Sequence, residues 1–517
     1  MTKQSPFKDR MKEIKAISAE LFSLYKHHPS LAGFYSYQEG SGTYYVPFVR
    51  EFSQHIKSLN PNLLTACAPH IDDPLLAGYL STVDELDIIM YQAGVMASYR
   101  TDNRKIYPFR RVKDFCALGA GARRLQNKIS INHVELFGYL ENRLTPDTTA
   151  TSYNNIRQQI LSAATVTGAD GISFFTYQAH VYETAKKLTQ VERSRAAVAE
   201  GVKAFDLIRE KVSHQPNFFA VYFPYSDWII ERWPNFFLPA LDGFRVLGEP
   251  VDVLPYAPPI DESVYPYYPF HKNEDVLARL LREKVALVLP NVSGFQQTDS
   301  DLIKAFVEQG GVVVAFGPQI PMGRSYDRSE LFGIEEDSGA RSHSEVIVES
   351  VLGPRTKHAD RFNVKVEPGV VWKLKSSKAI AKFEDGSPAV VVNKFGKGTA
   401  IAVIPDAMNA AQNMAQLTRE VLDYARSLRG QASLVDIIGA NEKSDLAVAE
   451  TTRGFRVAFV NHDNSEQAIE FRPANSNLAK PTWIDLTSGV PIKTTSAVLA
   501  LKIPPNGFRV IEFLRDR

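Results

Sequence analysis

The sequence predicts an α/β protein: a partial (β/α)8 TIM barrel with about five of the eight strands, then a doubly wound α/β domain, then a β-sandwich. Apolar strand-like segments alternate with helical segments in the first part of the chain, and this alternation resumes after Pro216. Short strands separated by turn residues follow from about residue 432. We therefore expect three domains, over residues 1–212, 213–430 and 431–517.

The barrel domain is expected to contain five parallel strands, each followed by a helix, with one more helix before the first strand. The strands are expected near residues 31–38, 63–69, 86–92, 129–135 and 170–177. The helices are expected near residues 6–27, 45–59, 73–83, 107–126, 151–167 and 188–211. Most residues of these strands are apolar or aromatic, as is typical of parallel strands that are buried on both faces.

A closed barrel of this type has eight strands, so a barrel of five is three strands short. Either the chain begins inside a longer gene product, with about 90 residues of barrel upstream, or the five-stranded sheet is complete and open. In the first case the strand near 31–38 is the fourth of the barrel and the strand near 129–135 is the seventh. The chain alone would then be poorly soluble or inactive, because its strand edges lack their neighbours.

The other two domains show different strand patterns. The doubly wound domain is expected to have strands at 218–223, 250–254, 285–289, 310–316, 379–383, 389–392 and 399–404. Its helices are expected at 234–247, 274–284, 299–309 and 408–428. The sandwich is expected to have strands near 446–451, 455–460, 468–471, 497–501 and 507–513.

The composition argues against several classes of partner. The 517 residues carry a formal net charge of +1, which gives no basis for binding nucleic acid or an anionic membrane. No apolar run approaches the ~20 residues of a transmembrane helix, and the N-terminus lacks the apolar core of a signal peptide. Since Cys67 and Cys116 are the only cysteines, we expect no disulfide framework, and a reducing, cytoplasmic setting fits.

Two glutamates stand where strands of the barrel are expected to end. Glu39 closes the apolar segment that begins at Leu31, and Glu135 closes the segment that begins at Ile129. Catalytic groups of a parallel barrel stand at the carboxyl ends of its strands. Two carboxyl groups about 5–5.5 Å apart can cleave a glycosidic bond with retention of configuration. We therefore predict a retaining glycoside hydrolase that needs no cofactor, acting on an oligo- or polysaccharide through Glu39 and Glu135.

The neighbours of the two glutamates suit different protonation states. Four tyrosines flank Glu39 and would raise its pKa by desolvation: Tyr35, Tyr37, Tyr44 and Tyr45. Glu135 follows Asn132 and His133, whose hydrogen bonds can keep a carboxylate ionised. The simpler alternative is that both glutamates are ordinary loop-end carboxylates, and Glu141 competes with Glu135 for the second role.

Polar and aromatic residues at the strand ends are expected to bind the sugar. They are Tyr37, Gln38, His70, Tyr91, Gln92, Tyr177, Gln178 and His180. Asp72 and Asp73 are more simply explained as N-caps of the helix that begins near Pro74. A metal site with His70, His180 and Asp72 is an alternative, but no ligand spacing singles it out, so we predict none.

The doubly wound domain has the strand pattern of a glutamine amidotransferase. That chemistry needs a nucleophilic cysteine at a strand-to-helix turn, and neither cysteine of this chain lies in residues 213–430. The run Asn291-Val-Ser-Gly294 also lacks the Gly-x-Ser-x-Gly pattern of a serine nucleophile. We therefore expect this domain to be structural.

The order of the three domains resembles the β-galactosidases of glycoside hydrolase family 42. Residues 218–405 look like the trimerisation domain of that family, including the run Phe383-Glu-Asp-Gly-Ser-Pro-Ala-Val-Val-Val-Asn-Lys-Phe-Gly-Lys-Gly398. The barrel is similar to a poorly characterised family of bacterial barrels suspected of glycoside hydrolysis, over the stretches 33–39, 86–94 and 134–137.

This resemblance implies roles for the two glutamates. In the clan that includes family 42, the acid/base ends the fourth strand and the nucleophile ends the seventh, which implies Glu39 as acid/base and Glu135 as nucleophile. The clan usually has Asn-Glu at the acid/base, whereas this chain has Gln38-Glu39. That departure, with the missing strands, leaves a second hypothesis: a catalytically inactive carbohydrate-binding or scaffold protein.

The resemblance also implies a homo-oligomer, possibly a trimer, built through the doubly wound domain. A group of aromatic residues in that domain fits a subunit contact: Trp228, Trp233, Tyr265, Tyr267 and Tyr268. The alternative is that these rings pack against the barrel of the same chain.

Overall fold

The chain forms two compact units that interleave in sequence. The computed structural model describes residues 8–36, 44–69, 76–92, 111–135, 153–166, 168–175, 188–210, 217–224, 233–259, 269–290, 296–317, 329–350, 353, 355–405, 411–474, 482–492, 494 and 496–515. The first unit comprises Met1–Lys203 and Leu254–His271, and the second comprises Ala204–Val253 and Lys272–Arg517. No described helix is both long enough and apolar enough to span a membrane.

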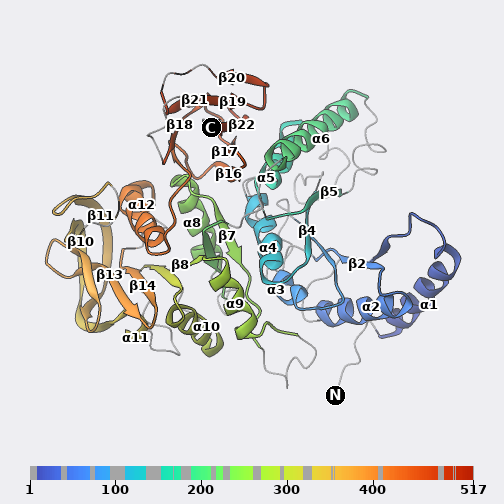
Figure 1. Cartoon of the computed structure of the whole chain (residues 1–517), viewed down its shortest axis with the longest axis horizontal. Helices are drawn as coiled ribbons and strands as arrows, with labels where there is room; N and C mark the ends of the chain where they lie inside the picture. Colours follow the sequence, from blue (N-terminus) through green and yellow to red (C-terminus); the bar gives the residue numbers. More distant parts are fainter. Residues whose placement is uncertain are drawn as a thin grey trace. The chain divides into compact units, whose positions relative to one another are not determined.

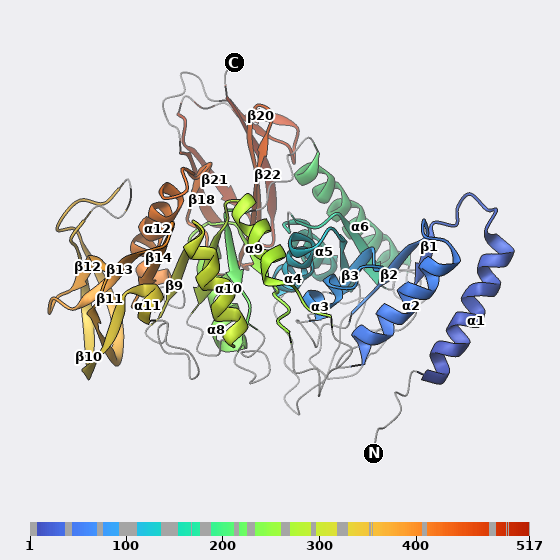
Figure 2. The same ribbon diagram turned by 60° about the horizontal axis from the view of Figure 1, so that its bottom comes forward.

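The first unit is built on one parallel sheet with the strand order β1-β2-β3-β4-β5. Its elements are α1 (Lys8–Tyr25), β1 (Gly33–Tyr35), α2 (Tyr45–Leu59), β2 (Leu64–Cys67), α3 (Leu76–Ser81), β3 (Ile88–Gln92), α4 (Arg111–Leu125), β4 (Ile129–Glu135), α5 (Tyr153–Ala164), β5 (Gly171–Phe175) and α6 (Leu188–Arg209). Helices α2 to α5 pack against the strands (Figures 1 and 2). The structure confirms the partial barrel, and in its described part β1 and β5 are the two edge strands of this sheet.

The two faces of this sheet differ in burial. The residues that face the helices, such as Cys67 and Ile89, are almost fully buried. Residues on the opposite face are partly exposed: Leu64 at 38% and Ile129 at 39%, near the amino ends of their strands, and Tyr35 at 44%, at the carboxyl end of β1. Because side chains alternate along a strand, this contrast separates a helix face from an inner face of the barrel.

Helix α1 packs against α2 with only part of its apolar stripe. Met11 is buried, and Lys15 forms an ion pair of 2.7 Å with Glu51 of α2. Leu21 and Leu24, near the end of the helix, are exposed at 41% and 66%. The predicted helix is therefore present, but these two leucines do not contribute to the described core.

Residues Leu254–His271 join the first unit although they follow a strand of the second. His271 fixes this segment on α3: its Nδ1 accepts a hydrogen bond of 3.0 Å from the amide of Ala257. Its Nε2 lies 2.8 Å from the hydroxyl of Ser81. The Nδ1 acceptor role leaves the ring proton on Nε2, so a neutral His271 donates to Ser81.

The second unit contains a nine-stranded mixed sheet with the order β11-β10-β12-β13-β14-β9-β8-β6-β7. The strands are β6 (Phe219–Tyr222), β7 (Val251–Leu254), β8 (Ala286–Pro290), β9 (Val312–Phe316), β10 (Ile334–Val348), β11 (Arg361–Leu374), β12 (Lys378–Phe383), β13 (Pro388–Phe395) and β14 (Gly398–Val403). The helices are α8 (Trp233–Val246), α9 (Asn273–Arg282), α10 (Gln297–Glu308), α11 (Ser329–Phe332) and α12 (Ala411–Ser427). Strands β14, β9, β8 and β6 are mutually parallel and nearly fully buried, as expected for a doubly wound sheet.

A long antiparallel hairpin, β10 with β11, extends this sheet at one end, and the sequence did not predict it. The segment Ile334–Val348 carries acidic residues and Ser338-Gly339, which read as a turn rather than a strand. Its pairing is interrupted by three register shifts, so it lacks the regular alternation that marks a strand in a sequence.

The C-terminal part forms the predicted β-sandwich. One sheet has the order β15-β18-β21 and the other β16-β17-β22-β19-β20. The strands are β15 (Val435–Ile438), β16 (Ser444–Thr451), β17 (Gly454–Asn461), β18 (Gln467–Pro473), β19 (Thr482–Asp485), β20 (Val490–Ile492), β21 (Leu499–Ile503) and β22 (Phe508–Leu514). A buried cluster around Trp483, Phe455 and Phe513 joins the two sheets. The short strands β15, β19 and β20 were not predicted.

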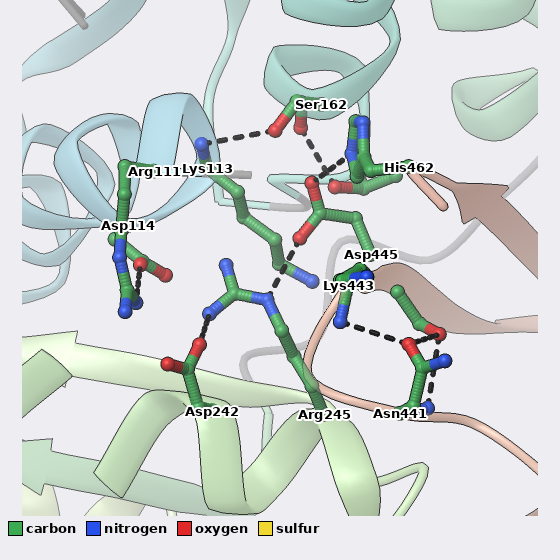
Figure 3. Close-up of polar contacts among 12 residues, drawn as sticks. Arg111, Lys113, Asp114, Ser162, Asp242, Arg245, Asn441, Lys443, Asp445 and His462 are labelled. Carbon is green, nitrogen blue, oxygen red and sulfur yellow. Dashed lines mark hydrogen bonds and ion pairs between the residues drawn. The ribbon is translucent and has the colours of Figure 1, made fainter. Parts of the chain in front are cut away.

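A buried ionic cluster ties α8 to the sandwich (Figure 3). Asp445 of β16 is fully buried and accepts a hydrogen bond of 3.0 Å from Nε of Arg245. Its other oxygen lies 2.8 Å from Nε2 of His462. Arg245 also reaches Asp242 at 3.0 Å, one turn back in α8. A carboxylate without exposure to water depends on these partners to remain charged.

Removing one member of this cluster should destabilise the second unit strongly. Arg245→Met keeps much of the aliphatic stem but leaves Asp445 buried without its guanidinium, so we expect a loss of about 3–5 kcal/mol in the free energy of unfolding. Urea denaturation measures this loss. The matched control is Arg472→Met, because the Arg472–Glu470 pair lies on the surface, where water screens it, and should contribute far less to stability. Equal losses for the two variants would contradict the prediction.

Candidate active site

The parallel register brings the carboxyl ends of β1 to β5 to one rim of the first unit. Glu39 follows the last residue of β1, Tyr35, by four positions, and Glu135 is the last residue of β4. Glu39 lies outside the described residues, and so does the side chain of Glu135.

Most of the predicted sugar contacts also lie beyond the described part of the chain. They are Tyr37, Gln38, His70, Tyr177, Gln178 and His180, together with Asp72, Asp73 and Glu141. The predicted interface residues Trp228, Tyr265, Tyr267 and Tyr268 are outside it as well, as is the side chain of Trp233. Two predicted contacts, Tyr91 and Gln92, are described in full.

Tyr91 and Gln92 are consecutive residues of β3, so they face opposite sides of the sheet. Tyr91 is fully buried on the helix face, where a Cβ built on Gly119 of α4 would come within 2.7 Å of the Tyr91 Cβ. The absence of a side chain at Gly119 thus makes room for the ring. This packing places Tyr91 away from the inner face, so we leave it out of the proposed site and retain Gln92.

A row of polar side chains crosses the inner face near the rim. Gln92 of β3 pairs in register with His133 of β4, and His133 pairs with Ser173 of β5. The Nδ1 atom of His133 lies 2.6 Å from the Ser173 hydroxyl. The amide nitrogen of Gln92, a residue only 1% exposed, has no hydrogen-bond partner among the described residues. Three neighbouring strands therefore present polar groups directly below the rim.

Strand β4 is also held from the helix face and at its start. The amide of Asn132 donates a hydrogen bond of 2.8 Å to the carbonyl of Ala163, at the end of α5. The backbone amide of Ser130 donates to the carboxylate of Asp170 at 2.9 Å, just before β5. Nearby, the backbone amide of Lys113 in α4 donates to the Ser162 hydroxyl at 3.1 Å (Figure 3). The contacts of Asn132 and Ser130 hold the strand that ends at Glu135, and the contact of Lys113 joins α4 to α5 beside it.

Burial sets the protonation of the groups around the site. Burial lowers the pKa of His133 from about 6.5 to about 4, so its imidazole is neutral at pH 7. Burial raises the pKa of the Cys67 thiol to about 12, so this thiol stays protonated and is a poor nucleophile. In the described residues no group of three or more His, Cys, Asp or Glu side chains could hold a metal ion.

The tyrosines around the end of β1 differ in exposure. Tyr45 is buried, and this burial raises the pKa of its hydroxyl well above the usual range. Tyr35 and Tyr44 are exposed at 44% and 48%. Of these three tyrosines only Tyr45 is fully buried, and the expected desolvation of Glu39 stays a prediction because Glu39 lies outside the described residues.

Comparison with known proteins identifies the fold. No protein-family model matches the chain, and neither does any curated protein. Among solved structures, a cold-adapted β-galactosidase from Rahnella sp. R3 matches with a TM-score of 0.61 and 15% identity, over 99% of this chain and 82% of that one. A family 42 β-galactosidase from G. stearothermophilus matches with a TM-score of 0.53 and 14% identity, over 98% and 74%.

An α-L-fucosidase from Paenibacillus thiaminolyticus also matches, with a TM-score of 0.57 and 11% identity, over 97% of this chain and 80% of that one. At these identities the likeness shows a shared fold. The predicted resemblance to family 42 β-galactosidases is confirmed at that level, and the chain has the architecture of glycoside hydrolases.

The buried neutral His133 predicts a loss of stability in mild acid. Between pH about 6.5 and 4 the unfolded chain protonates this histidine while the folded chain does not, so the unfolded state binds more protons. The free energy of unfolding should therefore fall by up to about 3 kcal/mol as the pH is lowered through this window. Urea denaturation from pH 7 to 4 measures the slope.

The variant His133→Asn should have a shallower slope than the wild type, because the asparagine does not titrate. The exposed His27 offers a matched control, and His27→Asn should keep the wild-type slope. A His133→Asn slope that equals the wild-type slope would show that His133 is not the proton-linked group.

Proposed function

We propose that this protein is a retaining glycoside hydrolase in which Glu39 is the acid/base and Glu135 the nucleophile. The observation that carries the proposal is the strand order of the first unit, in which β1 and β4 end at the same rim with two strands between them. This is the separation expected for the fourth and seventh strands of the barrel. The shared fold with β-galactosidases and a fucosidase supports a carbohydrate substrate.

The spacing of the strands is compatible with this pairing only if the sheet curves. Three inter-strand steps of about 4.8 Å separate β1 from β4 by roughly 14 Å along the sheet. Retaining hydrolysis needs carboxyl groups about 5–5.5 Å apart, so the curvature of a barrel and two inward side chains must close the difference. The proposal therefore depends on an inward direction for both glutamates.

A carbohydrate-binding or scaffold protein without activity is the second candidate. The residue before the proposed acid/base is Gln38, where the clan of family 42 usually has asparagine. A protein of this kind would bind sugar at the same rim without turnover. We propose a cytoplasmic setting for either function, because Cys67 and Cys116 are both free thiols, as is usual in a reducing compartment.

Replacing the two glutamates separates these candidates. The protein from its complete reading frame is assayed on nitrophenyl glycosides, which have a good leaving group, and on methyl glycosides, which have a poor one, of galactose and fucose, with Glu135→Gln and Glu39→Gln beside the wild type. We expect Glu135→Gln to abolish turnover and Glu39→Gln to lower kcat by about 10²–10⁴-fold for glycosides with poor leaving groups. The control is Glu141→Gln, which should keep wild-type turnover. Full activity of Glu135→Gln would assign the nucleophile to another residue, and an inactive wild type that still binds sugar would favour the scaffold.

We also propose that the chain forms a homo-oligomer, possibly a trimer, through its doubly wound domain. The resemblance of residues 218–405 to a trimerisation domain supports this assembly. Light scattering of the protein from its complete reading frame, at micromolar concentration, should give a mass that is two or more times the monomer mass. A clean monomer mass would rule the assembly out.

A further inference from the structure

Strand β4 is held by side-chain hydrogen bonds on both of its faces, at two consecutive residues. On the helix face Asn132 donates to the carbonyl of Ala163, and on the inner face His133 contacts Ser173 of β5. The backbone ladder between β4 and β5 already sets the register of these strands. The side-chain contacts therefore add rigidity at the end of the strand, where the proposed nucleophile stands.

The contact on the inner face uses a buried polar side chain where an apolar one would fit. His133 is 8% exposed, and burying a polar ring costs free energy that hydrogen bonds such as the one to Ser173 must offset. The residue before it on the same face is Ile131, and Met90 precedes Gln92 on β3 in the same way, so the face is apolar further down. An apolar residue at 133 would continue this apolar packing without the cost.

We propose that His133 is a positioning residue for Glu135: held by Ser173, it fixes the end of β4 and thereby the approach of the carboxylate to the anomeric carbon. This inference rests on the proposed function, in which Glu135 is the nucleophile. No part of the proposal assigns His133 a proton transfer or a contact with the reacting atoms.

The spacing along the strand suits this role. Residues 133 and 135 occupy positions on the same face and are separated by two residues, or about 6.6 Å of strand. An imidazole fixed at 133 therefore supports the space directly below position 135. A displacement of about 1 Å at a reacting group can cost on the order of 10²-fold in rate, so the rigidity of this support has a kinetic consequence.

The ring is also suitable electrostatically. Burial lowers the pKa of His133 to about 4, so the ring is neutral where the enzyme would work. A cation at this position would stabilise the carboxylate in its resting state and weaken its attack. A neutral ring supports the strand by hydrogen bonding alone. The amide nitrogen of Gln92, which has no hydrogen-bond partner among the described residues, lies beside it on the same face.

The test uses two amides that mimic different atoms of the ring. Asparagine places its amide near the Nδ1 position, which contacts Ser173, whereas glutamine places it near Nε2. We expect His133→Ala and His133→Gln to lower kcat on a nitrophenyl glycoside by about 10²-fold with KM changed by less than about twofold. His133→Asn should recover most of kcat. Ser173→Ala should lower kcat as well, and the double variant His133→Ala/Ser173→Ala should be no worse than His133→Ala alone.

Several outcomes overturn the proposal. They are a wild-type kcat in His133→Ala, a loss that appears only in KM, equal kcat values for the asparagine and glutamine variants, and additive losses in the double variant. If His133→Ala does not fold, Ser173→Ala and the asparagine–glutamine comparison decide. The variant Glu135→Gln shows whether the positioning role alone is wrong or the proposed function is wrong as well. When Glu135→Gln is inactive but His133→Ala is normal, only the positioning role is wrong; when Glu135→Gln is fully active or the wild type is inactive, both proposals fail.

Discussion

The parallel backbone pairing of β1 to β5 is the constraint on which the proposed site depends. Since all five strands run the same way, their carboxyl ends lie at one rim, and residues far apart in sequence come to one edge of the sheet. The same register decides which side chains share a face. It places Gln92, His133 and Ser173 together in a row and turns Tyr91 to the helices. One residue of slippage in β3 would exchange Tyr91 and Gln92 between the faces.

In the second unit, buried ion pairs link elements that do not belong to the same sheet. Arg426 of α12 pairs with Glu249 and Asp423. Burial raises the pKa of both carboxyl groups, and the opposing effect of the guanidinium only partly offsets this rise. Together with the Arg245–Asp445 pair, this network joins the helices of the doubly wound domain to each other and to the sandwich. Buried pairs of this kind add little net stability over apolar packing, but they penalise any arrangement that separates the partners. They therefore favour one docking of the sandwich on α8 over others.

The sequence predicted those elements whose pattern is set by local chemistry. The apolar runs at β8 and β9 were recognised because strands buried on both faces are apolar throughout. The hairpin of β10 and β11 was missed because its residues are polar and its register is irregular, so its strands depend on pairing with each other. Site residues were hardest to predict where the argument depends on which face of the sheet a side chain occupies. Tyr91 and Gln92 were both predicted as sugar contacts, since the sequence shows that side chains alternate between two faces of a strand but not which face is covered by helices. His133 was noted only as a neighbour of Glu135, because its partner Ser173 is 40 residues away in the sequence.

The amide of Gln92 bears on carbohydrate binding, which both candidate functions require. Its nitrogen has no hydrogen-bond partner among the described residues, and a buried N–H donor gains free energy when an acceptor reaches it. Hydroxyl groups of a sugar are suitable partners, and the inner face offers this donor beside a neutral ring and below the rim where Glu135 ends β4. Both candidate functions need a bound sugar, so this amide supports carbohydrate binding in either. What distinguishes the enzyme is the rigid His133–Ser173 contact, because binding tolerates a small displacement of β4, whereas displacement of a nucleophile by about 1 Å slows its reaction severely.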